Sequence, residues 1–206
     1  MRKGICVPMM TLFLLVSCSG IRKTEPVDLR SRYQEMTGCC MEAVVTCEQA
    51  GAEWEAVLKC DYIPEGESTV EVLDPETVAG VKAVFSDSDW RLVYDHVCLN
   101  AGTLSQEKLS PALCLPRLMS ALRNGWLLEK NEEEWQEIPC LRIALDQSGP
   151  QGGKIVSILW LRQDDGIPLR GEIAVDGEII LTAEFTDFVF YDTIDSVNEH
   201  EDLLSQ

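Results

Sequence analysis

Apolar and polar residues alternate with a period of two along most of the chain. Runs of this kind cover 41–47, 54–62, 67–73, 81–85, 90–94, 140–145, 167–175 and 179–189. Two further runs, 126–129 and 134–137, flank an acidic turn, and 155–161 is apolar on both faces. Period-two alternation is typical of strands that bury one face. Asp165-Gly166 and Asp176-Gly177 are typical hairpin turns. The pattern predicts about ten antiparallel strands.

Two helices are expected, one before the strands and one among them. Residues 26–36 place apolar side chains near one face, and Gly38 ends that segment. Ser110-Pro111 has the form of a helix start, and Gly125 stands where a C-terminal glycine belongs. Pro116 either kinks this helix or moves its start. A sheet of this size must curl and cover its apolar face, so we expect an α+β fold with these two helices as covers.

The large apolar side chains of the predicted strands have two open interpretations. They form an ordinary core, or they line a groove for an apolar ligand or a partner segment. The groove candidates are Met41, Val45, Trp54, Leu58, Trp90, Leu92, Tyr94 and Trp160.

The N-terminus predicts export and a lipid anchor. Arg2 and Lys3 precede a nearly apolar stretch over 5–16, which is too short to span a bilayer and is typical of a signal peptide. The stretch ends in Leu15-Val16-Ser17-Cys18, which resembles the lipobox of bacterial lipoproteins. This resemblance implies cleavage before Cys18 and a diacylglyceryl group on its thiol. The expected place is therefore the extracytoplasmic face of the cell membrane.

These features divide the chain into four parts. We expect a lipoprotein signal peptide over 1–17, a lipid tether over 18–25, one domain over 26–195 and an acidic tail over 196–206. About 190 residues suit a single domain with a sizeable core.

The charge of the chain limits its partners. Thirty-five acidic residues oppose 17 basic ones, for a net charge of −18. Such a surface repels phosphate backbones, which argues against nucleic acid as a partner, and it steers basic partners toward the chain. The simplest interpretation of the charge is solubility alone.

The cysteines and acidic runs predict neither a metal site nor a cofactor. Seven cysteines remain after Cys6 leaves with the signal and Cys18 takes the lipid, and none forms a Cys-x-x-Cys pair. An odd number leaves at least one thiol free or paired between chains. The Glu132-Glu133-Glu134 and Asp164-Asp165 runs are better explained as charged turns than as cation ligands. Apart from the covalent lipid, we expect no cofactor.

Catalytic patterns are lacking. Asp95 and His96 are adjacent in a predicted strand, so their side chains point to opposite faces and cannot form the orienting pair of a triad. His200, the other histidine, lies in the acidic tail. No Gly-x-Ser-x-Gly is present. We therefore expect a protein that is not an enzyme.

The C-terminal half resembles the LolA-like lipoprotein-carrier superfamily. The resemblance rests on the strand and charged turn of 158–166, the Gly166-Ile167-Pro168 that follows, Asp176-Gly177, and Phe185-Thr186-Asp187-Phe188. Element order extends it to roughly 28–192. It implies an unclosed antiparallel half-barrel whose apolar concave face is covered by helices. Where the carriers bring arginine to the cavity, this chain has the acidic run 67–72, which argues against the carrier mechanism.

Length and lipobox are more similar to the lipidated LolA-like proteins of clostridia, among them a spore-germination lipoprotein that works with a cell-wall amidase. This resemblance implies a membrane-anchored binding or regulatory protein whose partner modifies the cell wall during germination. The alternative is a carrier or sensor of an acyl chain or another apolar ligand in the half-barrel groove.

Overall fold

The computed structural model describes residues 29–49, 52–86, 89–95, 97–103, 110–149 and 153–191. The signal peptide, Cys18, both histidines and the acidic tail lie outside these residues. Among the described residues, no helix is long and apolar enough to cross a membrane.

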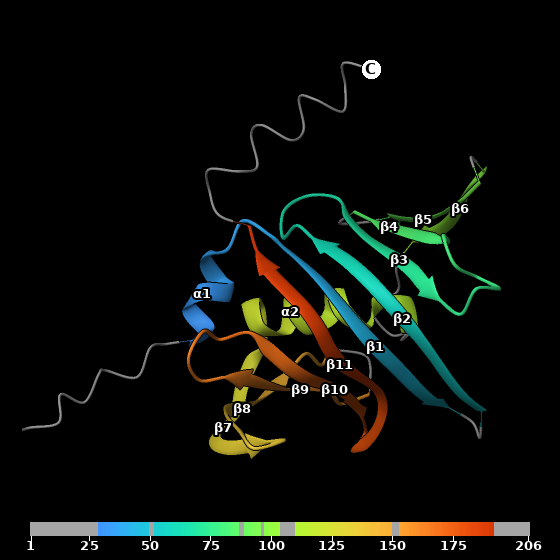
Figure 1. Cartoon of the computed structure of the whole chain (residues 1–206). Helices are drawn as coiled ribbons and strands as arrows, with labels where there is room; N and C mark the ends of the chain where they lie inside the picture. The colour runs from blue at the N-terminus through green and yellow to red at the C-terminus, as the bar shows by residue number, and fades with distance from the viewer. Residues whose placement is uncertain are drawn as a thin grey trace, which may run out of the picture.

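One antiparallel sheet of eleven strands forms the frame of the molecule (Figure 1). The strands are β1 (Cys39–Gln49), β2 (Ala52–Tyr62), β3 (Ser68–Asp74), β4 (Lys82–Phe85), β5 (Asp89–Tyr94), β6 (Val97–Thr103), β7 (Trp126–Trp135), β8 (Ile138–Asp146), β9 (Ile155–Arg162), β10 (Pro168–Val175) and β11 (Glu178–Phe190). Their order is β6-β5-β4-β3-β2-β1-β11-β10-β9-β8-β7. Because β6 and β7 are edges, the sheet is not closed, as predicted.

Two helices and a short 3-10 turn complete the fold. They are α1 (Leu29–Glu35), η1 (Pro111–Leu113) and α2 (Cys114–Asn124). Pro111 opens the segment as expected, and the backbone N–H of Gly125 donates to Ala121 O, 2.7 Å away, at the end of α2. Pro116 falls in the first turn of α2, where a proline costs no hydrogen bond. In Figure 1 α2 crosses behind the strands on one side of the sheet.

Two local predictions were wrong. The expected acidic turn near residue 130 is part of β7, and the real turn is at Gln136 and Glu137, whose φ values are 50° and 67°. No strand was predicted over 97–103, where the structure has β6. Both errors fall on edge strands. An edge strand need not bury a continuous apolar face, so its sequence carries little alternation.

The core lies between α2 and the concave face of the sheet. Six α2 residues are buried, and the four large side chains among them are fully buried: Leu115, Leu118, Met119 and Leu122. A Cβ on Gly171 of β10 would lie 2.5 Å from Leu118 Cδ1, so the helix sits in direct contact with the strand backbone. This part of the concave face is therefore filled by the chain itself.

α1 closes the remaining gap beside α2. Tyr33 is fully buried, donates its hydroxyl to Gly166 O at 2.5 Å, and packs edge-to-face on Phe188 and Phe190. Arg30 donates to the carbonyl oxygens of Leu122, at 2.8 Å, and Gly125. These contacts fix the start of the domain at the C-terminal end of α2.

The seven described cysteines are all free. In the register of β1 and β2, Cys47 lies opposite Trp54, and Cys60 lies opposite Met41. The two thiols are thus six positions apart along β1, on the order of 20 Å, which is far beyond disulfide reach.

The cysteines predict a simple labelling result. Cys98 on β6 is exposed, Cys40 is half-buried, and the other five described cysteines are buried. We expect a thiol reagent to label Cys98 rapidly in the folded chain lacking residues 1–18, and Cys98→Ser to remove that fast phase. Labelling is followed by the absorbance of the released thiolate. A fast phase unchanged by Cys98→Ser would contradict the placement of β6.

Buried thiols also make the fold sensitive to alkali. Burial raises the pKa of Cys114 to about 12, with a smaller contribution from nearby Cys47. The thiol of an unfolded chain ionises near pH ~8.5. The contribution of the neutral, buried Cys114 thiol to the stability of the fold is therefore complete below that pH and is lost as the pH rises toward 12. We expect the free energy of unfolding to fall by up to ~1.4 kcal/mol per pH unit for this thiol. Urea titrations from pH 8 to 11 should show a shallower fall in Cys114→Ala. An equal slope would contradict the burial of this thiol.

Candidate binding surface

One cross-strand row of apolar side chains runs along the concave face from the centre of the sheet to its β6 edge. The strand registers place its members opposite one another in the order Met41, Cys60, Val70, Ala83, Leu92 and Leu99. The first four are at most 3% exposed, Leu92 is half-buried, and Leu99 is 61% exposed. The same apolar face that is core under α2 thus becomes accessible at the far end of the sheet.

The accessible end of this face is formed by β5 and β6. Tyr94 and Val97, which pair directly, are 54% and 56% exposed beside Leu99. Trp90 lies on the same face, half-buried, with its ring stacked on Phe85 at 6.1 Å and an interplanar angle of 8°. We call Trp90, Leu92, Tyr94, Val97 and Leu99 the wing surface. In Figure 1 β4, β5 and β6 lie at the opposite end of the molecule from α1.

The charges of β3–β5 lie on the opposite, convex face. Lys82 pairs with Glu71 at 3.0 Å, and Arg91 pairs with Glu67 at 2.7 Å. Period-two alternation keeps these residues away from Leu92 and Tyr94. The acidic run of 67–72 therefore does not bring its carboxylates to the concave face, because Ser68, Val70 and Val72 occupy that side. The carboxylates of this run therefore do not disfavour an apolar ligand on the concave face.

The structure brings together seven of the eight groove candidates on the concave face. Met41, Val45 and Leu58 are buried in the core beneath α2 and η1, whereas Trp54 is half-buried at its margin. Trp90, Leu92 and Tyr94 belong to the wing surface. Val97 and Leu99 were missed because Cys98 between them breaks the alternation of apolar and polar residues, although the two large aliphatic residues are spaced by two.

Trp160 lies on the convex face, contrary to the prediction. In β9 the alternate residues Leu159 and Leu161 face α2, so Trp160 must face the other way. Its indole N–H donates to Glu133 Oε2 at 3.0 Å, and its ring lies 5.9 Å from that of Trp135. When both faces of a strand are apolar, its sequence does not show which face packs against the helix and which face lies on the other side.

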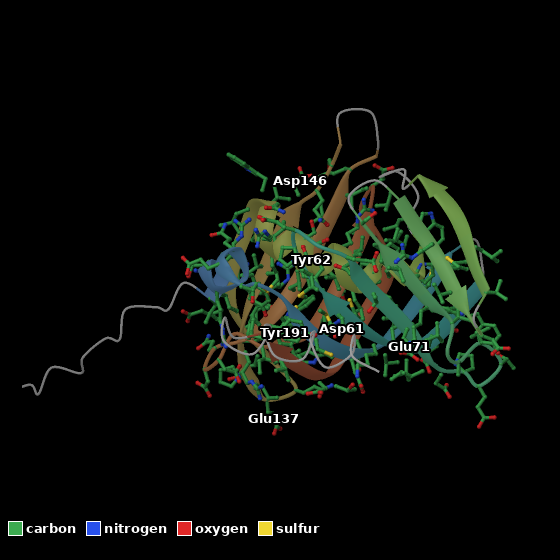
Figure 2. The ribbon with its side chains drawn as sticks, turned by 90° about the horizontal axis from the view of Figure 1, so that it is seen from above. Asp61, Tyr62, Glu71, Glu137, Asp146 and Tyr191 are labelled. Atoms are coloured by element: carbon green, nitrogen blue, oxygen red, sulfur yellow. The ribbon has the colours of Figure 1, made fainter. Side chains whose placement is uncertain are left out.

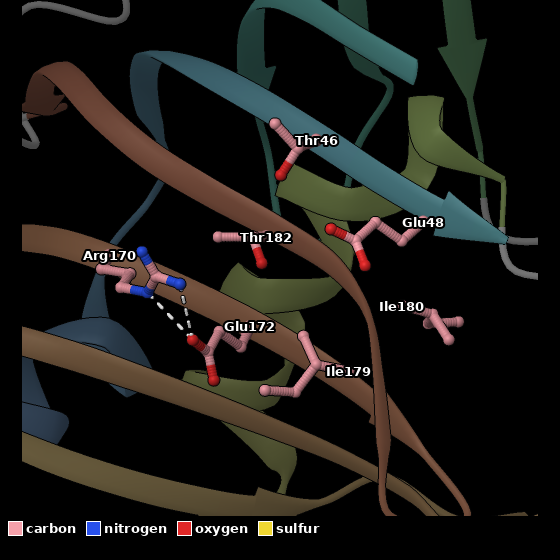
Figure 3. A pocket seen from close by; sticks show the side chains of 7 residues that line it. All are labelled: Thr46, Glu48, Arg170, Glu172, Ile179, Ile180 and Thr182. Carbon is pink, nitrogen blue, oxygen red and sulfur yellow. Dashed lines mark hydrogen bonds and ion pairs between the residues drawn. The ribbon is translucent and has the colours of Figure 1, made fainter. Parts of the chain in front are cut away.

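The convex face carries a hollow of about 230 Å³ near Arg170 (Figure 3). Its lining comes from β1, β10 and β11 and consists of Thr46, Glu48, Arg170, Glu172, Ile179, Ile180 and Thr182. The Arg170 guanidinium is already bound by Glu172 at 2.8 Å and Glu184 at 3.0 Å, and it lies 4.6 Å from the Trp135 ring centroid. These contacts make Arg170 a structural link between strands.

Another polar contact joins the C-terminal end of β11 to β2 across the intervening strand β1. Tyr191, just after β11, donates its hydroxyl to Asp61 of β2 at 2.5 Å, and Figure 2 labels both residues. Desolvation and this carboxylate raise the pKa of Tyr191. A phenol held protonated beside a structural carboxylate is no general base at neutral pH. Among the described residues, no group of three or more His, Cys, Asp or Glu side chains has the arrangement of a metal site.

Comparisons with known proteins find similarity in solved structures only. No family model and no curated protein matches the sequence. A LolA superfamily protein from Nitrosomonas europaea is 11% identical, with a TM-score of 0.47 over 80% of this chain and 91% of that one. LprF from Mycobacterium bovis is 12% identical, with a TM-score of 0.44 over 78% and 89%.

The lipoprotein LppX from Mycobacterium tuberculosis is 13% identical, with a TM-score of 0.42 over 80% of this chain and 96% of that one. One of these three is a LolA superfamily protein, and this is the superfamily that the C-terminal half of the sequence resembles. At these identities and TM-scores they carry no information on ligand or partner, which must come from this chain's own side chains.

Proposed function

We propose that this protein is a lipid-anchored, non-catalytic binding protein of the cell envelope. A diacylglyceryl group on Cys18 holds it at the extracytoplasmic face of the membrane. The wing surface binds an apolar segment of a partner protein, so that the anchored domain positions or regulates that partner. Catalysis is left to the partner.

The exposure gradient along the concave row carries this proposal. The row is filled by side chains of the protein itself where α2 covers it, and it ends in large apolar side chains that face solvent. Exposed apolar patches with polar surroundings mark interaction sites. Aromatic side chains such as Trp90 and Tyr94 are enriched at the centres of protein interfaces.

Charge defines the kind of partner. Both basic residues of the signal peptide are lost on cleavage, and no acidic residue is lost with them, so the mature chain changes from a net −18 to −20. A partner with an apolar contact segment and a basic rim is steered to such a protein. The resemblance to lipidated clostridial proteins suggests a cell-wall-modifying enzyme that acts in spore germination.

A second candidate function uses the same surface. An acyl chain or another apolar ligand would meet only uncharged side chains on the wing surface, because the carboxylates of Glu67 and Glu71 face the other way. The protein would then be a carrier or sensor. This candidate ranks second because α2 fills the deeper part of the concave face.

Native mass spectrometry separates the two candidates. The tagged, lipid-modified chain is extracted from membranes of its own organism in mild detergent. We expect a complex with a second protein that Leu99→Glu abolishes and Ile179→Glu retains, since Ile179 is also exposed but lies at the convex hollow. A retained acyl lipid lost in Leu99→Glu would favour the second candidate. The proposal would be contradicted if the chain were recovered with neither a second protein nor an acyl lipid, or if Leu99→Glu left the complex unaffected.

A further inference from the structure

A second exposed apolar patch lies at the other end of the molecule, at the start of edge strand β7. Trp126 is 77% exposed, and Leu127 and Leu128 are 43% and 46% exposed. In the register Trp126 is opposite Asp146, which Figure 2 labels, and Leu127 is opposite Leu145. We call Trp126, Leu127 and Leu128 the tether-side patch.

The rest of β7 differs sharply from this patch. Its exposed residues are charged or polar, including Glu129, Lys130, Glu132 and Glu133. Charges of this kind protect an edge strand from pairing with other chains. The three consecutive apolar residues at the start of β7 carry no charge that would protect the edge, and they are exposed rather than packed in the core.

The patch lies beside the point at which the N-terminal tether joins the domain. Arg30, the second residue of α1, binds the carbonyl oxygen of Gly125, which immediately precedes Trp126. Cys18 is eleven residues before Leu29, so the lipid can lie at most about 36–40 Å from the start of α1. A lipid held in a bilayer therefore keeps the start of α1 within that distance of the membrane surface.

We infer that the tether-side patch is a second membrane contact, in which Trp126, Leu127 and Leu128 insert into the interface of the bilayer that holds the Cys18 lipid. This inference rests on the proposed anchorage. Tryptophan favours the membrane–water interface because one end of its ring system is apolar and its N–H is polar. Three side chains bind a bilayer weakly by themselves, but the lipid makes the contact intramolecular and raises its effective concentration.

This contact fixes the orientation of the domain. The patch and α1 lie at one end, and β4–β6 lie at the other end of the molecule (Figure 1). With the patch on the bilayer, the wing surface points away from the membrane. A net acidic domain is repelled by anionic headgroups, so zwitterionic lipid is the suitable test surface.

Quenching of tryptophan fluorescence by brominated phosphatidylcholine tests the inference. The lipid-modified protein is reconstituted into phosphatidylcholine vesicles with and without brominated acyl chains. We expect a bromine-sensitive component that is lost in Trp126→Phe and kept in Trp135→Phe, whose ring packs against Trp160 instead. Leu127→Glu/Leu128→Glu, which leaves the Trp126 probe in place, should reduce the quenching.

Vesicle flotation and the mass of the N-terminal peptide separate this inference from the proposed anchorage. A chain that carries lipid on Cys18 and floats with vesicles, but shows no bromine-sensitive emission, would overturn the membrane contact and leave the anchorage standing. Equal quenching in wild type and Trp126→Phe would overturn the contact as well. An N-terminal peptide without lipid would overturn both.

Discussion

Leu118→Ala is expected to lower the free energy of unfolding by about 3 kcal/mol, because Leu118 is fully buried between α2 and β10. Gly171→Ala should cost about 1–3 kcal/mol by overpacking, since its new Cβ would lie 2.5 Å from Leu118 Cδ1. The double variant removes the clash and fills part of the cavity. It should therefore be more stable than the sum of the two effects by about 1–2 kcal/mol. Urea denaturation measures all three.

The preceding variants form a double-mutant cycle, and its matched control combines Leu122→Ala with Gly171→Ala. Leu122 is as buried as Leu118, but the nearest atoms to a Cβ on Gly171 all belong to Leu118. We expect the control pair to be additive. Additive effects in the Leu118 pair would mean that α2 does not contact β10 in this way, and a ligand could then reach the space between them.

Tyr94→Glu/Leu99→Glu is expected to weaken partner binding by about 100-fold or more. Each substitution brings a carboxylate into an apolar contact where it has no counterion. Both positions are exposed in the free protein, so its unfolding temperature should barely change. Fluorescence titration of the recovered partner against the wild-type and variant chains measures the affinity.

Ile179→Glu is again the matched control for this prediction. It adds one carboxylate at an exposed apolar position on the other face of the sheet. We expect its affinity to equal that of the wild type. If the double variant bound as tightly as the control, the wing surface would have no part in recognition.

The alternation of apolar residues predicted the antiparallel sheet because most of its strands bury one face, whereas the open form of the sheet was implied by the resemblance to the LolA-like superfamily. The Asp176-Gly177 turn was equally predictable from its residues, whereas the turn at Gln136 and Glu137 was not. Asp176 and Gly177 both adopt positive φ, at 51° and 92°, as a type I′ hairpin requires. Pro111 marked the start of the mid-chain helical segment for a reason that is local to the backbone. Gly125 marked its end, but its backbone is extended rather than left-handed, and a Cβ there would lie 2.7 Å from Ala121 O and 3.0 Å from Leu145 Cβ.

The position of the candidate site could not be predicted in the same way. Alternation shows that one face of β5 is apolar, but not whether a helix covers it, because coverage depends on where α2 lies across the sheet. Trp160 was placed on the wrong face since both faces of β9 are apolar. The direction of Glu71 could have been predicted, because Val70 and Val72 on either side of it point into the concave face.

The fold separates its tasks by position. α2 and the central strands form a filled core, the α1 end carries the tether-side patch, and the β6 edge carries the wing surface. This arrangement suits a protein that holds a partner at a fixed side of the membrane.

Site-specific photo-crosslinking in living cells tests the role of the wing surface most directly. A photoreactive amino acid replaces Leu99 in the anchored protein, and Ile179 in a parallel variant. The proposed function predicts one recurrent crosslinked protein from Leu99, absent from Ile179 and lost when Tyr94→Glu is added. Crosslinks of equal yield from both positions, or a Leu99 crosslink that survives Tyr94→Glu, would contradict it.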